Sequence, residues 1–288
     1  MNLNVISFSE VYKWDTCHRQ WYYRFDLGLK PIEESNAINT GIKGHGLLQF
    51  FYRALKEGKT KEEAWEITRR AANLLIKNES MTERAALLVA WTLVDNYIRD
   101  TDFTSKAVLV ENRFLIPVSA VVSSSIVDAY RLQDVQIGFT PDVMFNREGN
   151  FYDVEDAKFV GRAWPKKKLD MFQQAKLYQI FLRRMGYDVS LSVIRFFNVT
   201  TGKITVKNDP LTIDEEKIIL DDFLDAVQEV NRYKKSSPEQ LKRTRRTANY
   251  TTCQFCAFAY PCHLERQGKN ATMTLENEYT KSDYDYSS

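Results

Sequence analysis

Apolar residues recur at helical spacing along roughly the first third of the chain. The segment 7–25 starts at Ser7, a residue type that caps helices, and its apolar positions follow every three or four residues. The same spacing predicts a helix over about 41–57 and two amphipathic helices over 60–77 and 80–99. The chain therefore opens with a mainly helical region.

The pattern changes after Asp102, where short β-branched and aromatic runs alternate with turn residues. The runs AVLVENRFLIPV, VQIGFTPDVMF and FYDVEDAKFV predict strands, and VSLSVIRFFNV predicts another after a helix over about 166–186. A helix over about 213–234 leads into a cysteine-rich segment, and the polar last twenty residues are expected to fray. This order predicts a mixed α/β fold with a helical insertion near its start.

Composition narrows the class of protein without pointing to a partner. A chain of 288 residues with ordinary apolar and charged fractions is globular rather than disordered or fibrous. Its net charge of +2 means that any polyanion must bind to local patches. We expect no secretory signal and no membrane span, because no basic region precedes an apolar run and no stretch of about 18 apolar residues occurs. A cytoplasmic location follows, where clustered cysteines more often bind metal than form disulfides.

Acidic and basic residues on the predicted strands form a candidate cation site. Asp156 and Lys158 lie two apart on one strand and so share a face, whereas Glu155 points the other way. With Asp142 on the preceding strand, the carboxylates suit Mg²⁺ or Mn²⁺, and the lysine can orient a water. His45 could add an imidazole ligand, which favours Mn²⁺. Taken singly, these features also fit a solvated ion pair, a turn aspartate and a packed histidine.

The four cysteines divide between the two ends of the chain. Cys17 stands near the start, and Cys253-x2-Cys256-x5-Cys262 lies near the end. Four thiolates suit a tetrahedral Zn²⁺ or a [4Fe–4S] cluster, and spacing alone does not separate the two. A site that joins Cys17 to the other three would make residues 1–266 one domain, followed by a disordered tail over 267–288.

Taken in order, these segments resemble the motifs of the RecB-like branch of the PD-(D/E)xK nucleases. The resemblance is to its iron–sulfur exonucleases, which include the CRISPR-associated member and many phage proteins, and it spans about 7–262. The matching segments are Ser7-x-Ser9-x-Val11 through Cys17-x-x-Gln20-Trp21-x-Tyr23, Gly41-x3-His45, Gly138…Pro141-Asp142, Asp156-Ala157-Lys158, Gln174-x3-Tyr178 and the terminal three cysteines. The chain departs from the family pattern at Phe159, where threonine or serine is frequent.

The resemblance implies a fold and a set of roles. The fold is a restriction-endonuclease-like core at about 105–200, a mixed central sheet flanked by helices, with a helical part at about 41–100 and a C-terminal iron–sulfur segment at 250–264. Cys17, Cys253, Cys256 and Cys262 would hold a [4Fe–4S] cluster. The implied cation ligands are His45, Asp142, Asp156 and the carbonyl of Ala157, with Lys158 acting on the water. Gln174 and Tyr178 would support the site or contact DNA. Glu111 is a second-rank acidic candidate, equally well explained as an exposed strand carboxylate.

Two basic clusters are candidates for contact with DNA phosphates. They consist of Lys166, Lys167 and Lys168, and of Lys242, Arg243, Arg245 and Arg246. A solvated helix face and a flexible linker are the alternatives. The aromatic residues of the first helix could stack on single-stranded bases or form core; they are Trp14, Trp21, Tyr22 and Tyr23.

The expected function is a Mn²⁺- or Mg²⁺-dependent DNA exonuclease that acts on single strands or DNA ends. It would serve recombination, replication or repair in a bacterial or phage-infected cell, with recombination or replication proteins or further copies of the chain as possible partners. The alternatives are a CRISPR-adaptation nuclease, a catalytically silent or partner-dependent DNA-binding subunit, and a zinc-stapled interaction module.

Overall fold

The computed structural model describes most of the chain and divides it into two compact units. The described residues are 4–33, 35–147, 149–161, 173–246 and 250–282. Unit 1 is made of residues 1–33, 114–139 and 220–288, and unit 2 of 34–113 and 140–219. Each unit is thus assembled from stretches that are distant in sequence.

Unit 2 is built on a five-stranded mixed sheet in the order β3–β6–β7–β8–β9. Strands β7 and β8 run parallel, and the other neighbouring pairs run antiparallel. The sequence patterns predict these strands except for β9. Their bounds are β3 Lys106–Val110, β6 Val143–Asn146, β7 Phe151–Val160, β8 Asp188–Asn198 and β9 Ile204–Asp209.

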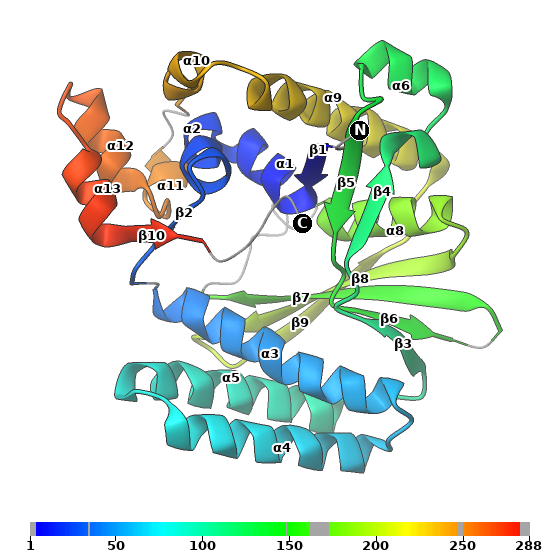
Figure 1. Cartoon of the computed structure of the whole chain (residues 1–288). Coiled ribbons are helices and arrows are strands. Elements are labelled where there is room, and N and C mark those ends of the chain that lie inside the picture. The colour runs from blue at the N-terminus through cyan, green and yellow to red at the C-terminus, as the bar shows by residue number, and fades with distance from the viewer. Residues whose placement is uncertain (1–3, 34, 148, 162–172, 247–249, 283–288) are drawn as a thin grey trace. The chain divides into compact units, whose positions relative to one another are not determined.

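Helices cover both faces of this sheet (Figure 1). On one side lie α3 (Asn36–Lys56), α4 (Lys61–Asn78) and α5 (Met81–Asp100), and on the other lies α8 (Gln174–Arg184). The three helices predicted between 41 and 99 are confirmed. Their apolar faces form one core with the sheet, which includes the fully buried Leu47, Phe51, Leu87 and Phe197.

Strand β7 presents alternate residues to the two helical layers. The Glu155 carboxylate accepts hydrogen bonds from the hydroxyl groups of Tyr52 on α3 and Tyr97 on α5. Ala157 belongs to the same core. On the other face, Val160 packs with Ala175 of α8. The alternation predicted from the sequence is therefore confirmed, and Asp156 and Lys158 lie on the face opposite Glu155.

Unit 1 has a three-stranded sheet in the order β1–β5–β4, in which β1 is parallel to β5 and β4 is antiparallel to it. These strands are β1 Asn4–Ser7, β4 Phe114–Pro117 and β5 Val135–Phe139. The helices outside unit 2 are α1 Phe8–Thr16, α2 His18–Trp21, the π-helix η1 Tyr22–Asp26, the 3₁₀ turn η2 Val118–Ala120, α6 Ser124–Tyr130, α10 Pro238–Lys242, α11 Tyr250–Cys253, α12 Ala259–Arg266 and α13 Thr272–Glu278. Helix α9 (Ile213–Lys234) continues from unit 2 into unit 1.

The first predicted helix begins where expected but is not continuous. The Ser7 side chain accepts the backbone N–H of Glu10 at 3.1 Å and so caps α1. At Cys17 the backbone is extended (φ −169°, ψ 115°), which separates α1 from α2. The aromatic residues of this region are buried: Trp14, Trp21 and Tyr23 are at most 1% exposed. The idea that they stack on bases is therefore wrong, because no face of these rings is open to a ligand.

The segment after 266, which the sequence predicts to be a frayed tail, contains regular structure among its described residues. It forms α13 and then β10 (Tyr279–Lys281), which pairs antiparallel with β2 (Leu29–Pro31). The Tyr279 ring stacks on Phe258 with centroids 5.2 Å apart, and its hydroxyl donates to the carbonyl of Ala257 at 2.6 Å. The buried ring of Tyr279 therefore anchors this otherwise polar segment.

Among the described helices, none combines the length and the apolar character needed to span a membrane.

Candidate active site and cysteine pocket

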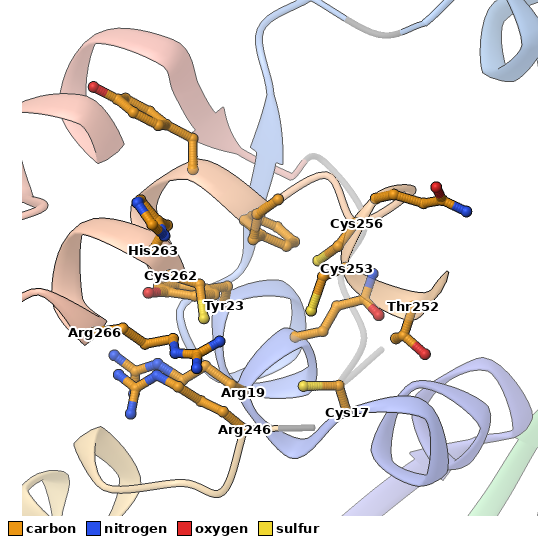
Figure 2. Close-up of a pocket in the computed structure, with 15 residues that line it drawn as sticks. Cys17, Arg19, Tyr23, Arg246, Thr252, Cys253, Cys256, Cys262, His263 and Arg266 are labelled. Carbon is orange, nitrogen blue, oxygen red and sulfur yellow. The ribbon is translucent and has the colours of Figure 1, made fainter. Parts of the chain in front are cut away.

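The four cysteines of unit 1 surround a single cavity of about 430 Å³ (Figure 2). No disulfide joins these four described cysteines. Cys17 comes from the break between α1 and α2, and the others come from α11, the turn after it and α12. The break in the first helix therefore serves to turn Cys17 toward the C-terminal three.

The spacing of the sulfur atoms tests which group they could hold. Among the described residues, the group of three or more His, Cys, Asp or Glu ligand atoms that lie within 4.8 Å of one another contains no cysteine. Around one Zn²⁺, four sulfur atoms would lie roughly 3.8 Å apart. The four thiols are thus not gathered as closely as around a bound Zn²⁺. As thiols that line one cavity, they suit either a Zn²⁺ or an iron–sulfur cluster. Burial raises the pKa of both Cys256 and Cys262, so these thiols are protonated unless a metal group displaces the proton.

The residues of the second basic cluster differ in exposure. Lys242, Arg243 and Arg245 are exposed, whereas Arg246 lines the cysteine pocket. The Arg246 guanidinium donates to Glu265 at 2.7 Å and lies within hydrogen-bond reach of the Cys262 thiol. Arg246 thus makes an inward contact, while its contact with DNA stays a prediction. Lys166, Lys167 and Lys168 lie outside the described residues.

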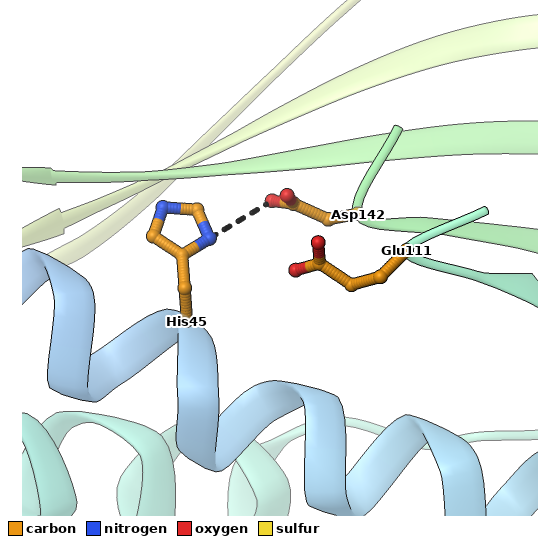
Figure 3. Close-up of side chains that lie close together, drawn as sticks. All are labelled: His45, Glu111 and Asp142. Atoms are coloured by element: carbon orange, nitrogen blue, oxygen red, sulfur yellow. Dashed lines mark ion pairs between the residues drawn. The ribbon is translucent and has the colours of Figure 1, made fainter. Parts of the chain in front are cut away.

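In unit 2, three side chains from three elements form a candidate cation site (Figure 3). The ligand atoms of His45 on α3, Glu111 after β3 and Asp142 before β6 all lie within 4.8 Å of one another. His45 Nδ1 stands 3.4 Å from Asp142 Oδ2. One imidazole and two carboxylates fit a divalent cation such as Mn²⁺.

The pairing of β3 with β6 brings the two carboxylates together. The register that pairs Val110 with Val143 places Glu111 opposite Asp142, and the Glu111 N–H donates to the Asp142 carbonyl at 2.9 Å. Glu111 has a φ of 50°, which is uncommon for a residue other than glycine. Such local strain is concentrated at functional sites.

The charges of this group are balanced only in part. Burial, followed by the Asp142 charge, raises the pKa of Glu111 to about 7. Burial would also raise the pKa of Asp142, but His45, Lys158 and the Ala157 N–H hold it below its usual range. The Asp142 carboxylate raises the pKa of His45 even though burial opposes this. Because two carboxyl groups compete for one imidazole, a bound cation would relieve their repulsion.

Asp156 and Lys158 lie beside this group as an ion pair. Asp156 is 2% exposed, and its Oδ2 is 2.7 Å from Lys158 Nζ. Burial raises the pKa of Asp156 to about 6, although Lys158 opposes the rise. Asp156 is not part of the 4.8 Å group, whereas Glu111 is, so the structure adds Glu111 to the candidate ligands and Asp156 stays a predicted one. The Ala157 N–H donates to Asp142 Oδ2 at 2.6 Å, which links the pair to the cation group.

Gln174 and Tyr178 on α8 support the same region from the other side of the sheet. The Gln174 amide donates to the Tyr178 hydroxyl at 2.6 Å, which donates in turn to the Thr140 carbonyl at 3.2 Å. Tyr178 is 3% exposed, and burial raises its pKa well above its usual range. These contacts link α8 to Thr140, two residues before Asp142, which is compatible with a supporting role.

Sequence reasoning ranked Glu111 too low and gave no weight to Thr140. A signal for Glu111 was available, because a carboxylate directly after one strand and another directly before the next are brought together by antiparallel pairing. The role of Thr140 comes through its backbone carbonyl, which residue identity does not reveal.

A family model covers most of the chain. The family model described as "PD-(D/E)XK nuclease superfamily" matches residues 5–263. A search of curated proteins gives no match. Among solved structures, SSO0001 aligns with 89% of this chain and 84% of its own at 13% identity and a TM-score of 0.39. A TM-score this low supports no inference about the fold or the function of this chain.

Proposed function

The chain belongs to the PD-(D/E)XK nuclease superfamily, and we propose that it is a Mn²⁺- or Mg²⁺-dependent DNA exonuclease that acts on single strands or DNA ends. The observation that carries this proposal is the pairing of two adjacent groups in unit 2. One is the cation group His45, Glu111 and Asp142, and the other is the Asp156–Lys158 ion pair. A metal-dependent nuclease needs a cation site and a polar group that orients the attacking water, both next to the same phosphate.

Each residue has a task in this reaction. His45, Glu111 and Asp142 would hold the cation, with Asp156 and the Ala157 carbonyl as further candidates. A divalent cation there supplies Lewis-acid stabilisation of phosphate charge and promotes deprotonation of water. The Lys158 ammonium, held by Asp156, orients the attacking water and offsets charge on the phosphate.

We assign a [4Fe–4S] cluster to Cys17, Cys253, Cys256 and Cys262. The cavity of about 430 Å³ that all four thiols line supports this assignment. The cluster would have a structural role, because it would tie the break after α1 to α12. The exposed Lys242, Arg243 and Arg245 next to this segment would bind strand phosphates. We propose that the enzyme serves DNA recombination, replication or repair.

The test is the cleavage of end-labelled single- and double-stranded DNA with Mn²⁺, Mg²⁺ or EDTA. Wild type should degrade DNA only with a divalent cation, and the ladder of products should start from an end. Lys158→Ala should lose activity by at least about 100-fold, since proton transfer and charge stabilisation typically contribute that much. Lys203→Ala is the matched control, because Lys203 is an exposed lysine of unit 2 in the turn before β9.

Two outcomes would contradict the proposal. Cleavage that survives Lys158→Ala would remove the lysine from the chemistry. If folded wild-type protein with the brown colour of an iron–sulfur cluster bound DNA without cutting it, a catalytically silent DNA-binding subunit would be indicated instead.

A further inference from the structure

Phe159 connects the active-site strand to the helix that carries His45. It follows Lys158 on β7, and its ring stacks on Phe197 of β8 with centroids 4.6 Å and planes 11° apart. The rings of Phe159 and His45 meet at a steep angle of 64°, with centroids 5.5 Å apart. Since Phe197 is fully buried, Phe159 rests on a rigid base while it touches the imidazole.

Two glycines of α3 make room for this ring. A Cβ added to Gly44 would lie 2.1, 2.3 and 2.6 Å from the ring-tip atoms Cζ, Cε1 and Cε2 of Phe159. One helical turn earlier, a Cβ on Gly41 would lie 3.6 Å from Phe159 Cβ. Only a residue without a side chain allows so close an approach at Gly44. Gly44 directly precedes His45, so the depth to which the ring enters the helix sets where the imidazole stands.

We propose that the contact between Gly44 and Phe159 positions His45 as a cation ligand and thereby sets a preference for Mn²⁺ over Mg²⁺. This inference rests on the proposed nuclease function, because it assigns His45 to the cation. Imidazole nitrogen suits Mn²⁺, whereas Mg²⁺ prefers oxygen ligands in near-octahedral geometry. A displaced imidazole should therefore weaken Mn²⁺ binding more than Mg²⁺ binding. Residues that orient metal ligands typically change affinity by about 10- to 100-fold.

The test compares four variants by calorimetric titration of Mn²⁺ and of Mg²⁺ into the full chain freed of divalent cations. Gly44→Ala introduces the clash, and Phe159→Leu removes all three ring-tip atoms. The double variant combines Gly44→Ala with Phe159→Leu, so that the added methyl group faces a shorter side chain. Gly46→Ala is the matched control on the same helix, since a Cβ there meets nothing within 4 Å.

Gly44→Ala should bind Mn²⁺ about tenfold more weakly, with Mg²⁺ affinity changed by about twofold or less. Gly46→Ala should match the wild type in both affinities. The double variant should bind Mn²⁺ more tightly than Gly44→Ala, because the added methyl group and the missing ring tip compensate each other. Helix propensity cannot produce this pattern, since both alanine substitutions gain about 1 kcal/mol from it.

The possible failures are distinguishable. Wild-type binding of Mn²⁺ with an unchanged Mn²⁺/Mg²⁺ ratio in Gly44→Ala would overturn the inference alone. A fall in both affinities in step with thermal stability would also overturn it, because the contact would then serve packing only. If the wild type bound Mg²⁺ but no Mn²⁺, the inference alone would fail, and if it bound neither cation, the proposed function would fail with it.

Discussion

At the scale of single residues, the sequence predicted the strand face on which a side chain lies better than it predicted which side chains lie close together. Strand alternation placed Asp156 and Lys158 on one face of β7 and Glu155 on the other, as the contacts confirm. The closeness of Glu111 to Asp142 depends on the register of β3 with β6 and on a left-handed backbone at Glu111. A glycine or asparagine at this position would have signalled that backbone, whereas glutamate does not.

Glu111 gives a pH dependence that can be measured without metal. Its pKa is raised to about 7 by burial and by Asp142, above its unfolded value of 4.5. A raised pKa contributes stability that is fully present below the unfolded pKa and is lost as pH rises through about 7. In EDTA the free energy of unfolding of the wild type should therefore fall by about 1 kcal/mol between pH 5 and pH 8 because of this group, after allowance for solvent screening. Glu111→Gln should lack that part of the loss.

Urea unfolding in EDTA at both pH values measures this difference. The same variant should bind Mn²⁺ at least about tenfold more weakly, since it loses one charged ligand. Equal pH slopes in wild type and Glu111→Gln would mean that Glu111 titrates as an exposed side chain. Glu66→Gln is not a suitable control because Glu66 pairs with two arginines, but the exposed Glu62→Gln is.

At the scale of elements, long amphipathic helices were predictable and short irregular pieces were not. The capping box of Thr60 and Glu63 marks the start of α4, and apolar periodicity marks its length. In contrast, the break at Cys17 has no proline or glycine to announce it. The runs read as single strands contain β3 and β4, and β5 and β6, which belong to different sheets. Hydrophobic pattern alone gives the strand type but not which sheet a strand joins.

The stretch after α10 yields a prediction for DNA binding. Arg246 donates to Glu265, whereas the other three cations of the cluster are exposed to solvent: Lys242, Arg243 and Arg245. Each phosphate contact on a single strand contributes a salt slope of about −0.7. Changing all three to glutamine should therefore reduce the slope of log K against log salt by about 2.

Fluorescence anisotropy with a labelled single strand in EDTA measures this slope, because cleavage is then absent. Neutralising the exposed Lys56, Lys59 and Lys77 instead should leave the slope within error of wild type if these lysines lie away from the strand. An equal loss in both triple variants would reveal a general charge effect. An unchanged slope in the first would sink the phosphate-binding assignment.

At the scale of the whole molecule, the two chemistries belong to separate units. His45, Glu111, Asp142, Asp156 and Lys158 lie in unit 2, and all four cysteines lie in unit 1. Helix α9 and the step from β5 to Asp142 pass between the units along the chain. The order of the motifs in sequence did not reveal this division, because each unit draws on distant stretches. Contacts at long sequence separation decide it, and no local pattern encodes them.

The C-terminal segment should protect the cysteine pocket without affecting the cation site. Tyr279 stacks on Phe258, which stacks on Tyr23, and Phe258 lies between Cys256 and Cys262 along the chain. Removing the Tyr279 ring takes away that support and the hydrogen bond to Ala257. Tyr279→Ala should therefore lose its visible absorbance to an iron chelator several-fold faster than the wild type, because local opening becomes easier.

Tyr279→Phe separates the two contributions, since it keeps the stacked ring and loses only a hydrogen bond worth about 1 kcal/mol. It should bleach at a rate between those of the wild type and Tyr279→Ala. Mn²⁺ affinity should be the same in all three proteins, because the cation ligands lie in the other unit. If Mn²⁺ affinity fell together with the colour, the two units would be energetically coupled and the segment would stabilise the whole chain. If Tyr279→Ala bleached at the wild-type rate, the ordered C-terminal segment would have no part in holding the cysteine pocket closed.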